Sequence, residues 1–198
     1  MKTFFRFVLA LCACAFLETA TATTVIPPSF DELVVQAELI FQGTVTDVKS
    51  QWVGEGGQRH IVSYVTMQVE EAIKGNPGAT YTLQMLGGTV GEDTMEVTDT
   101  PKFKVGDRDI LFVEHNGTQF IPLVGIMHGR FRVDRDKATG AEVVKNDKGV
   151  PVGDLAQLGR NKAPGEDERG NSAAAAGNAL RAADFKAAVR ARLGANNP

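Results

Sequence analysis

The alternation of apolar and polar residues predicts one short helix followed by a series of strands. Ser29-Phe-Asp-Glu32 has the spacing of a capping box, and apolar residues follow it at helical intervals up to Ala37. Farther along, runs rich in β-branched and aromatic residues show the two-residue period of strands. The predicted strands are residues 39–48, 61–69, 80–86, 109–114, 119–124 and 129–133.

Glycine and asparagine mark the connections between these strands. Gly54–Gly57 predicts a hairpin loop, residues 74–78 a tight turn, and Asn116-Gly117 a hairpin between the fourth and fifth strands. Gly43 inside the first strand predicts a bulge or a sharp bend. Residues 87–104 are polar and rich in Gly, Thr and Asp, and a loop of this length is often functional.

The C-terminal part of the chain differs in composition from the strands. Residues 161–178 carry almost no bulky apolar side chains, so burial cannot offset the entropy of ordering them. Residues 179–193 are strong helix formers with a narrow apolar stripe, and this helix docks either on the strands or on a partner. The predicted divisions are a signal peptide at 1–22, a β domain at 23–146, a disordered polar linker at 147–178 and a C-terminal helix at 179–194.

The first residues have the order of a secretory signal peptide. Lys2 and Arg6 precede the apolar run of residues 7–17, which is too short to span a bilayer, and the small residues Ala20-Thr-Ala22 follow. We expect cleavage after Ala22 and a secreted or periplasmic protein. The alternatives are a retained anchor and lipoprotein processing at Cys14.

Cleavage changes both the cysteine content and the charge. Cys12 and Cys14 are the only two cysteines, so the mature chain has no disulfide. Removal of Lys2, Arg6 and Glu18 from 21 basic and 24 acidic residues leaves 19 and 23, a formal charge of −4. This mild negative charge argues against nucleic acid and anionic membranes as main partners.

No motif of the sequence marks an enzyme, a metal site or a cofactor site. His60, His115 and His128 lie far apart without metal-ligand spacing, and neither a nucleophile elbow nor a phosphate-binding loop occurs. Asp134–Gly140 has acids at alternate positions but lacks the closing acid of a calcium loop, so a polar hairpin is favoured. We therefore expect a non-enzymatic protein without a cofactor; an enzyme would need polar groups that converge from distant segments.

A family resemblance distinguishes between two folds that the pattern alone fits almost equally, a small barrel and a β-sandwich. The short motifs that carry it are Pro27-Pro28, Gly43-Thr-Val45, Lys74-Gly75, Gly87-Gly88 and Pro101–Gly106. In this order they resemble the netrin-module and tissue-inhibitor-of-metalloproteinases superfamily, and most of all exported bacterial proteins of that type, over about residues 27–133. The resemblance implies a mainly β fold: a small antiparallel barrel of the oligonucleotide/oligosaccharide-binding (OB) type with a short N-terminal helix.

The same resemblance implies a protein partner. In the animal inhibitors of this superfamily, the mature N-terminus begins with a disulfide-bonded cysteine that chelates the zinc of a protease. Here the expected N-terminus, Thr23–Pro28, has no cysteine, so it would have to become ordered at the moment of binding.

The residues that we expect to contact a partner lie in three segments: the N-terminal arm, the first hairpin loop and the long polar loop. They are Thr24, Val25, Ile26, Pro27, Pro28, Trp52, Gly87, Gly88 and Phe103. The sequence thus predicts an exported binding or inhibitor-like module, with a secreted metalloprotease as the first partner to test. The alternative is a cell-envelope glycan-binding domain, in which an exposed aromatic side chain such as Trp52 contacts sugars.

Overall fold

A computed structural model describes residues 26–137, 139–159 and 179–195. The predicted signal peptide, Thr24, Val25 and most of the predicted linker lie outside the described residues. Where they are described, the residues form a mainly β, antiparallel fold with two α-helices, as predicted. None of the described helices is long and apolar enough to cross a membrane.

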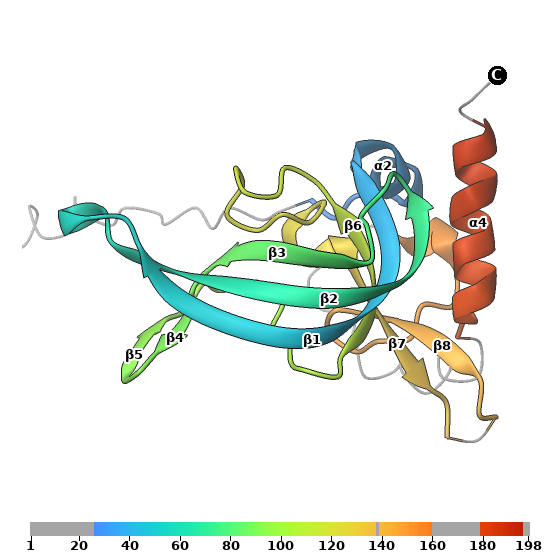
Figure 1. Cartoon of the computed structure of the whole chain (residues 1–198). Helices are drawn as coiled ribbons and strands as arrows, with labels where there is room; N and C mark the ends of the chain where they lie inside the picture. The colour runs from blue at the N-terminus through green and yellow to red at the C-terminus, as the bar shows by residue number, and fades with distance from the viewer. Residues whose placement is uncertain (1–25, 138, 160–178, 196–198) are drawn as a thin grey trace, which may run out of the picture.

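Six strands form one antiparallel sheet, and two short strands form a separate hairpin (Figure 1). In spatial order, the sheet consists of β3 (Thr80–Leu86), β2 (His60–Lys74), β1 (Leu39–Val53), β6 (Arg108–Val113), β7 (Arg130–Arg135) and β8 (Glu142–Asn146). The small hairpin pairs β4 (Gly88–Val90) with β5 (Asp93–Met95). Three short 3-10 helices lie in the connections: η1 (Gly56–Gln58), η2 (Ile126–Gly129) and η3 (Leu155–Gln157).

Strand β1 bends strongly because its pairing with β2 is interrupted by register shifts. One shift lies between Gln42 and Gly43, which confirms the irregularity predicted at this glycine. A Cβ atom at Gly43 would lie 2.7 Å from the backbone oxygen of Gln68, so only glycine permits this approach of the two strands. The bend allows one strand to pair with β2 along its length and with β6 over Leu39–Thr44.

The fifth predicted strand, residues 119–124, forms only isolated contacts. Leu123 makes a single bridge with Val113 of β6, and the amide of Leu86 at the end of β3 donates to the carbonyl of Phe120 at 2.8 Å. Pro122 has no N–H to donate, which prevents a regular ladder here. The segment therefore lies between β3 and β6, but in the described part of the chain the strands do not close into a complete barrel.

The sheet separates two apolar clusters, and β6 contributes to both. Ile110 and Phe112 face the cluster that also contains residues of both helices, whereas Leu111 and Val113 face the cluster enclosed by the curved strands β1, β2 and β3. A strand that is buried on both faces explains why residues 110–113 form a continuous apolar run.

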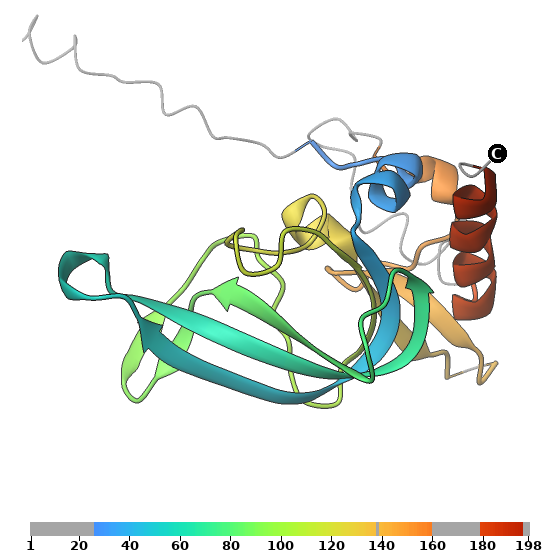
Figure 2. The ribbon, with the colours of Figure 1, turned by 45° about the horizontal axis from the view of Figure 1, so that its top comes forward.

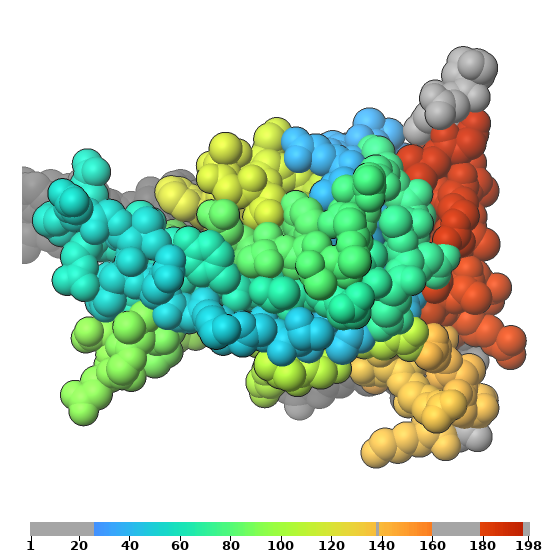
Figure 3. All heavy atoms as spheres, viewed as in Figure 1, coloured from blue at the N-terminus to red at the C-terminus, as the bar shows by residue number. Residues whose placement is uncertain are grey.

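The two helices, α2 (Phe30–Gln36) and α4 (Ala182–Ala195), pack together against one side of the sheet (Figure 2). Ser29 and Glu32 form the predicted capping box at the start of α2. The fully buried ring of Phe185 in α4 packs against those of Phe112 and Phe131, with centroid distances of 6.2 and 4.8 Å. The C-terminal helix thus docks on the strands, and in Figure 3 it lies along one end of the molecule. This is one of the two alternatives that the sequence left open.

Strand β8 and the residues after it differ from the sequence-based boundaries. Residues 136–137 and 139–141 lie in the polar connection of the β7–β8 hairpin. Residues 147–159 belong to the predicted linker, but the structure places part of them against β8, where Pro151 pairs with Lys145 and Val152 is 6% exposed. Leu180 donates its amide to Val152 and accepts one from Val144, so the C-terminal segment also covers this edge of the sheet.

Candidate functional site

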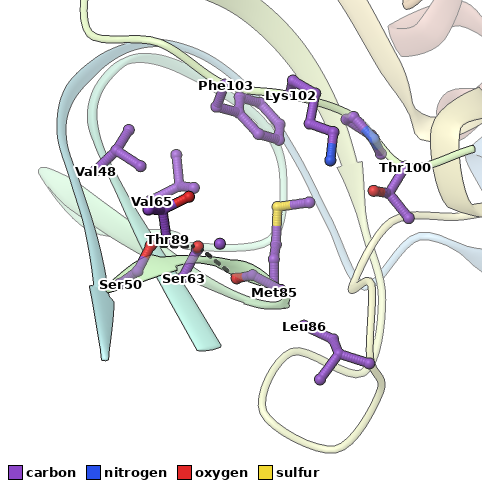
Figure 4. A pocket seen from close by; sticks show the side chains of 13 residues that line it. Val48, Ser50, Ser63, Val65, Met85, Leu86, Thr89, Thr100, Lys102 and Phe103 are labelled. Atoms are coloured by element: carbon purple, nitrogen blue, oxygen red, sulfur yellow. Dashed lines mark hydrogen bonds between the residues drawn. The ribbon is translucent and has the colours of Figure 1, made fainter. Parts of the chain in front are cut away.

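The concave face of β1, β2 and β3 opens into a hollow of about 290 Å³ at one end of the curved sheet, which we call the main hollow (Figure 4). Its apolar lining comprises Val48, Val65, Met85, Leu86, Pro101 and Phe103. Its polar lining comprises Ser50, Ser63, Thr89, Thr100 and Lys102, and Gly87 and Gly88 complete the wall. Figure 4 shows that Phe103 and Lys102 face Val48 and Val65 from the opposite side.

Strand register places these side chains on one face. Val48 pairs with Val65, and Ser50 pairs with Ser63 at the next position on the same face. The following pair is Trp52 and Ile61, so Trp52 continues the face beyond the serines. The Trp52 side chain is 37% exposed, and the guanidinium carbon of Arg59 lies 4.5 Å from its ring centroid.

Two serines and two glycines form the polar wall of the main hollow. The Ser50 and Ser63 hydroxyl oxygens are 2.8 Å apart, and the Ser63 hydroxyl donates to the Gly87 carbonyl at 2.6 Å. Gly87 and Gly88 have φ angles of +94° and +133°, and a Cβ atom at Gly88 would lie 2.2 Å from the Ser63 hydroxyl oxygen. Both positions therefore require glycine, which lets the chain turn directly over the serines into β4.

Phe103 on the opposite wall is held by a buried arginine. The Arg130 guanidinium carbon lies 4.1 Å from the ring centroid of Phe103. All five N–H groups of this guanidinium are used: they donate to Asp107, Asp109, Asp147 and the Lys102 carbonyl. Arg130 is 2% exposed. The network fixes the backbone at residue 102 and the ring at residue 103.

Asp109 is the most deeply buried carboxylate of this network. It is fully buried and binds Arg130 with both oxygens, at 3.0 and 3.1 Å. Burial raises the pKa of Asp109 to about 6, although the positive charge of Arg130 opposes this shift. The neighbouring carboxylate of Asp107 adds to the increase.

A second hollow of about 280 Å³, which we call the charged hollow, lies next to the main hollow. It is lined by Thr100, Lys102, Lys104, Asp107, Arg130, Arg132 and Asp147. Thr100 and Lys102 line both hollows. Residues 100–104 therefore form the wall that the two hollows share.

A third hollow of about 230 Å³ lies on the other side of the β1–β3 sheet, beside residues 117–120, and we call it the aromatic hollow. Its lining has no Lys, Arg, Asp or Glu side chain; among its residues are Tyr64, Gln84, Gln119 and Phe120. Phe120 is 73% exposed. The Asn116 side chain holds this loop on β3, since it accepts a hydrogen bond from the backbone N–H of Gln84 and donates one to the backbone carbonyl of Thr82.

The structure brings together some of the predicted partner-binding residues. Gly87, Gly88 and Phe103 line the main hollow, and Trp52 lies on the same face two residues beyond Ser50. The arm lies elsewhere: Pro28 packs near Gly125, and Ile26 is 74% exposed. Thr24 and Val25 lie outside the described residues.

Sequence reasoning missed several residues of the main hollow, above all Ser50, Ser63 and the Arg130 network. The two serines are 13 residues apart in the chain, so their contact could be predicted only from the register between β1 and β2. The alternation of Val48, Ser50 and Trp52 was a usable signal for a shared face. For Arg130, no local pattern in the sequence indicated burial.

The described histidines do not approach one another at a shared site. His60 contacts the Gln58 carbonyl at 2.9 Å, His115 lies between Glu38 and Glu114, and burial lowers the pKa of His128. Within residues 26–137, 139–159 and 179–195, no group of three His, Cys, Asp or Glu side chains is arranged to hold a metal ion.

Comparisons with protein-family models, curated proteins and solved structures gave no significant match.

Proposed function

We propose that this chain is an exported, non-enzymatic binding module, and that the main hollow takes an extended segment of a partner protein. The observation that carries the proposal is the uncovered end of the β1–β3 face, where apolar side chains, two hydroxyl groups and Trp52 follow one another. A volume of about 290 Å³ suits one or two side chains of a protein segment.

The proposal includes an OB-like fold of the netrin and metalloproteinase-inhibitor type. Contacts of residues 119–124 with both β3 and β6 support it, since this segment occupies the place of a strand that would complete a barrel. The exposed Ile26 supports a role for the N-terminal arm in contacts with a partner. An exported zinc metalloprotease is the first partner class to test.

The decisive experiment blocks the main hollow without disturbing the core. Thr89 is exposed at the rim, and its hydroxyl lies 3.0 Å from that of Thr94, which does not line the hollow. Peptides are selected from a displayed random octapeptide library on the wild-type protein. Thr89→Trp is expected to weaken their binding at least about tenfold, while the matched Thr94→Trp leaves it unchanged. Equal binding by both variants would refute the main hollow as the site.

A glycan-binding domain is the second candidate, and the aromatic hollow favours it. The exposed Phe120 and the half-buried Tyr64 lie beside side-chain amides, without a carboxylate, Lys or Arg in the lining, and this combination suits a neutral sugar. Addition of uncharged chitotetraose is expected to shift the NMR signals of Tyr64 and Phe120, and Phe120→Ala is expected to abolish the shift at Tyr64. Val35→Ala, at another exposed apolar residue, serves as the control. No shift with the wild-type protein at millimolar sugar would count against this candidate.

A further inference from the structure

We propose that the charged hollow is an acidic-residue subsite of the same binding site, so that the partner segment carries an apolar residue close to an Asp or Glu. This inference rests on the proposed function of the main hollow. Its starting observation is that the two hollows meet: Thr100 and Lys102 line both. A ligand in one hollow therefore lies at the opening of the other.

Two cations of the charged hollow, Lys104 and Arg132, form no ion pair with a described carboxylate. The lining of this hollow carries four positive side chains, Lys102, Lys104, Arg130 and Arg132, against the two carboxylates of Asp107 and Asp147. The buried Asp109 behind Arg130 adds a third carboxylate. Arg130 uses all its N–H groups within this network, so the cations that remain for a ligand are the lysines and Arg132.

These remaining cations have few internal partners. Lys102 makes one ion pair, with Glu96 at 3.4 Å, and both side chains are more than half exposed. Across the described residues, no carboxylate lies within ion-pair distance of Lys104 or Arg132. An incoming carboxylate therefore gains charge contacts without first breaking an internal pair.

The wall between the hollows is ordered before any ligand arrives. The Lys102 carbonyl accepts from Arg130, and the Lys104 amide donates to Asp107 at 2.9 Å. These bonds fix the backbone on both sides of Phe103. Because the wall is fixed in advance, binding requires little additional ordering of the protein.

The spacing of the wall indicates the motif that would bind. Phe103 lines the main hollow only, Lys104 the charged hollow only, and Lys102 both. One step along an extended chain advances about 3.3 Å. A segment that places an apolar side chain beside Phe103 therefore brings a side chain one or two positions away into the charged hollow, where Lys104 and Arg132 have no ion pair within the described part of the chain.

The test is a selection from a displayed random octapeptide library on three full-length mature proteins. Wild type is expected to enrich peptides with an apolar residue and an Asp or Glu one or two positions away. Lys104→Met/Arg132→Met is expected to keep the apolar preference and lose the acidic one. Lys49→Met/Arg135→Met, at exposed positions outside the hollows, matches the change in charge and is expected to behave as wild type.

The contribution of the acidic residue to affinity is measured with a capped peptide of the enriched sequence, which carries either Glu or Gln at the acidic position. We expect the Glu form to bind wild type about fivefold more tightly, and this difference to fall below about twofold in the double variant. On the wild-type protein alone, about 0.5 M salt is expected to remove most of the difference, which provides a test that needs no variant.

The outcomes separate the two proposals. Enrichment of apolar peptides without an acidic residue, or a Glu preference that survives in the double variant, would overturn the acidic subsite and leave the main hollow as a binding site. A wild-type protein that enriches no peptide would overturn the proposed function itself.

Discussion

Lys74 ties the first helix to the second strand. Its ammonium group donates to the carbonyls of Val34, Val35 and Ala37 at the C-terminal end of α2. Gly75 follows with a φ angle of +71°, and a Cβ atom there would lie 2.5 Å from a methyl carbon of Leu39. Lys74 and Gly75 therefore both have a structural role in this fold, which does not depend on any partner.

Substitution of Lys74 by Met is expected to lower the free energy of unfolding by about 1–3 kcal/mol, because three carbonyls lose a charged donor. Urea unfolding followed by circular dichroism measures the change. Lys49→Met is the control, since the Lys49 side chain is 79% exposed, and it is expected to stay within about 0.5 kcal/mol of wild type. Equal effects of both variants would contradict the capping role.

The raised pKa of Asp109 predicts a pH dependence of stability. Below the pKa of about 4 in the unfolded chain, Asp109 is protonated in both states. Between this value and the folded pKa of about 6, the folded state binds the proton more firmly. The stabilisation from this group is therefore complete below about pH 4 and is lost as the pH rises through 6.

NMR titration of the Asp109 carboxyl carbon is expected to give a midpoint near 6. In urea unfolding, the stability advantage of wild type over Asp109→Asn is expected to shrink between about pH 4 and pH 7. Glu70 and Glu71 act in the opposite direction, since hydrogen bonds from Arg108 and Lys186 lower their pKa values and their stabilisation is lost as the pH falls. A midpoint below 4 for Asp109 would contradict the prediction.

Among the elements, α4 is stabilised by both its apolar and its charged side. Phe185 and Val189 are fully buried, and Lys186 and Arg190 pair with Glu71 of β2. The aromatic contacts of Phe185 join α4 to α2 and to the sheet. The helix is thus part of the core, although a long stretch of chain separates it from β8.

Replacement of Phe185 by Ala is expected to cost about 3–5 kcal/mol of unfolding free energy, since it leaves a cavity in the apolar cluster between the helices and the sheet. Phe120→Ala provides the matched control, because the Phe120 side chain is 73% exposed. Chemical denaturation of both variants gives the comparison. A loss below about 1 kcal/mol for Phe185→Ala would mean that the helix contributes little to the core.

Sequence patterns predicted the elements in which apolar residues recur with one regular helical or strand period. The capping box placed α2, and alternation placed β2, β3, β6 and β7 near their observed positions. The segment 119–124 has strand-like composition, but Pro122 cannot donate to a ladder. Strands β4 and β8 are short, and tertiary contacts determine them: β4 lies against β1 and β2, and β8 pairs with β7 and with the C-terminal segment.

For the whole molecule, the sequence singled out residues on one wall of the main hollow but not the residues of its other walls. The glycines of the long loop and Phe103 were expected to bind a partner, and the structure brings them into one hollow. Further lining of that hollow comes from β1 and β2, and Phe103 is supported by Arg130 in β7, which is bound to Asp109 in β6. Contacts among four separate strands cannot be predicted from the hydrophobic periodicity of each segment alone.

The whole fold is expected to depend on its C-terminal end. A chain that stops at residue 159 lacks α4 and Leu180, so Phe112 and Phe131 lose their contacts with Phe185. We expect this truncation to lose the sharp, cooperative unfolding transition of the untruncated chain in calorimetry. Addition of a peptide covering residues 179–195 is expected to restore part of it. A truncated chain with an unchanged transition would contradict this dependence.

The backbone of Gly87 and Gly88 restricts how this protein could acquire a new specificity. Any other amino acid at these two positions meets either a steric collision or an unfavourable dihedral angle, so that side of the cavity is nearly invariant by construction. Changes of ligand preference must then come from other lining residues, and residues 100–104 form the wall across from the glycines. A directed-evolution library restricted to those five positions would vary the side chains of that wall and leave both glycines unchanged.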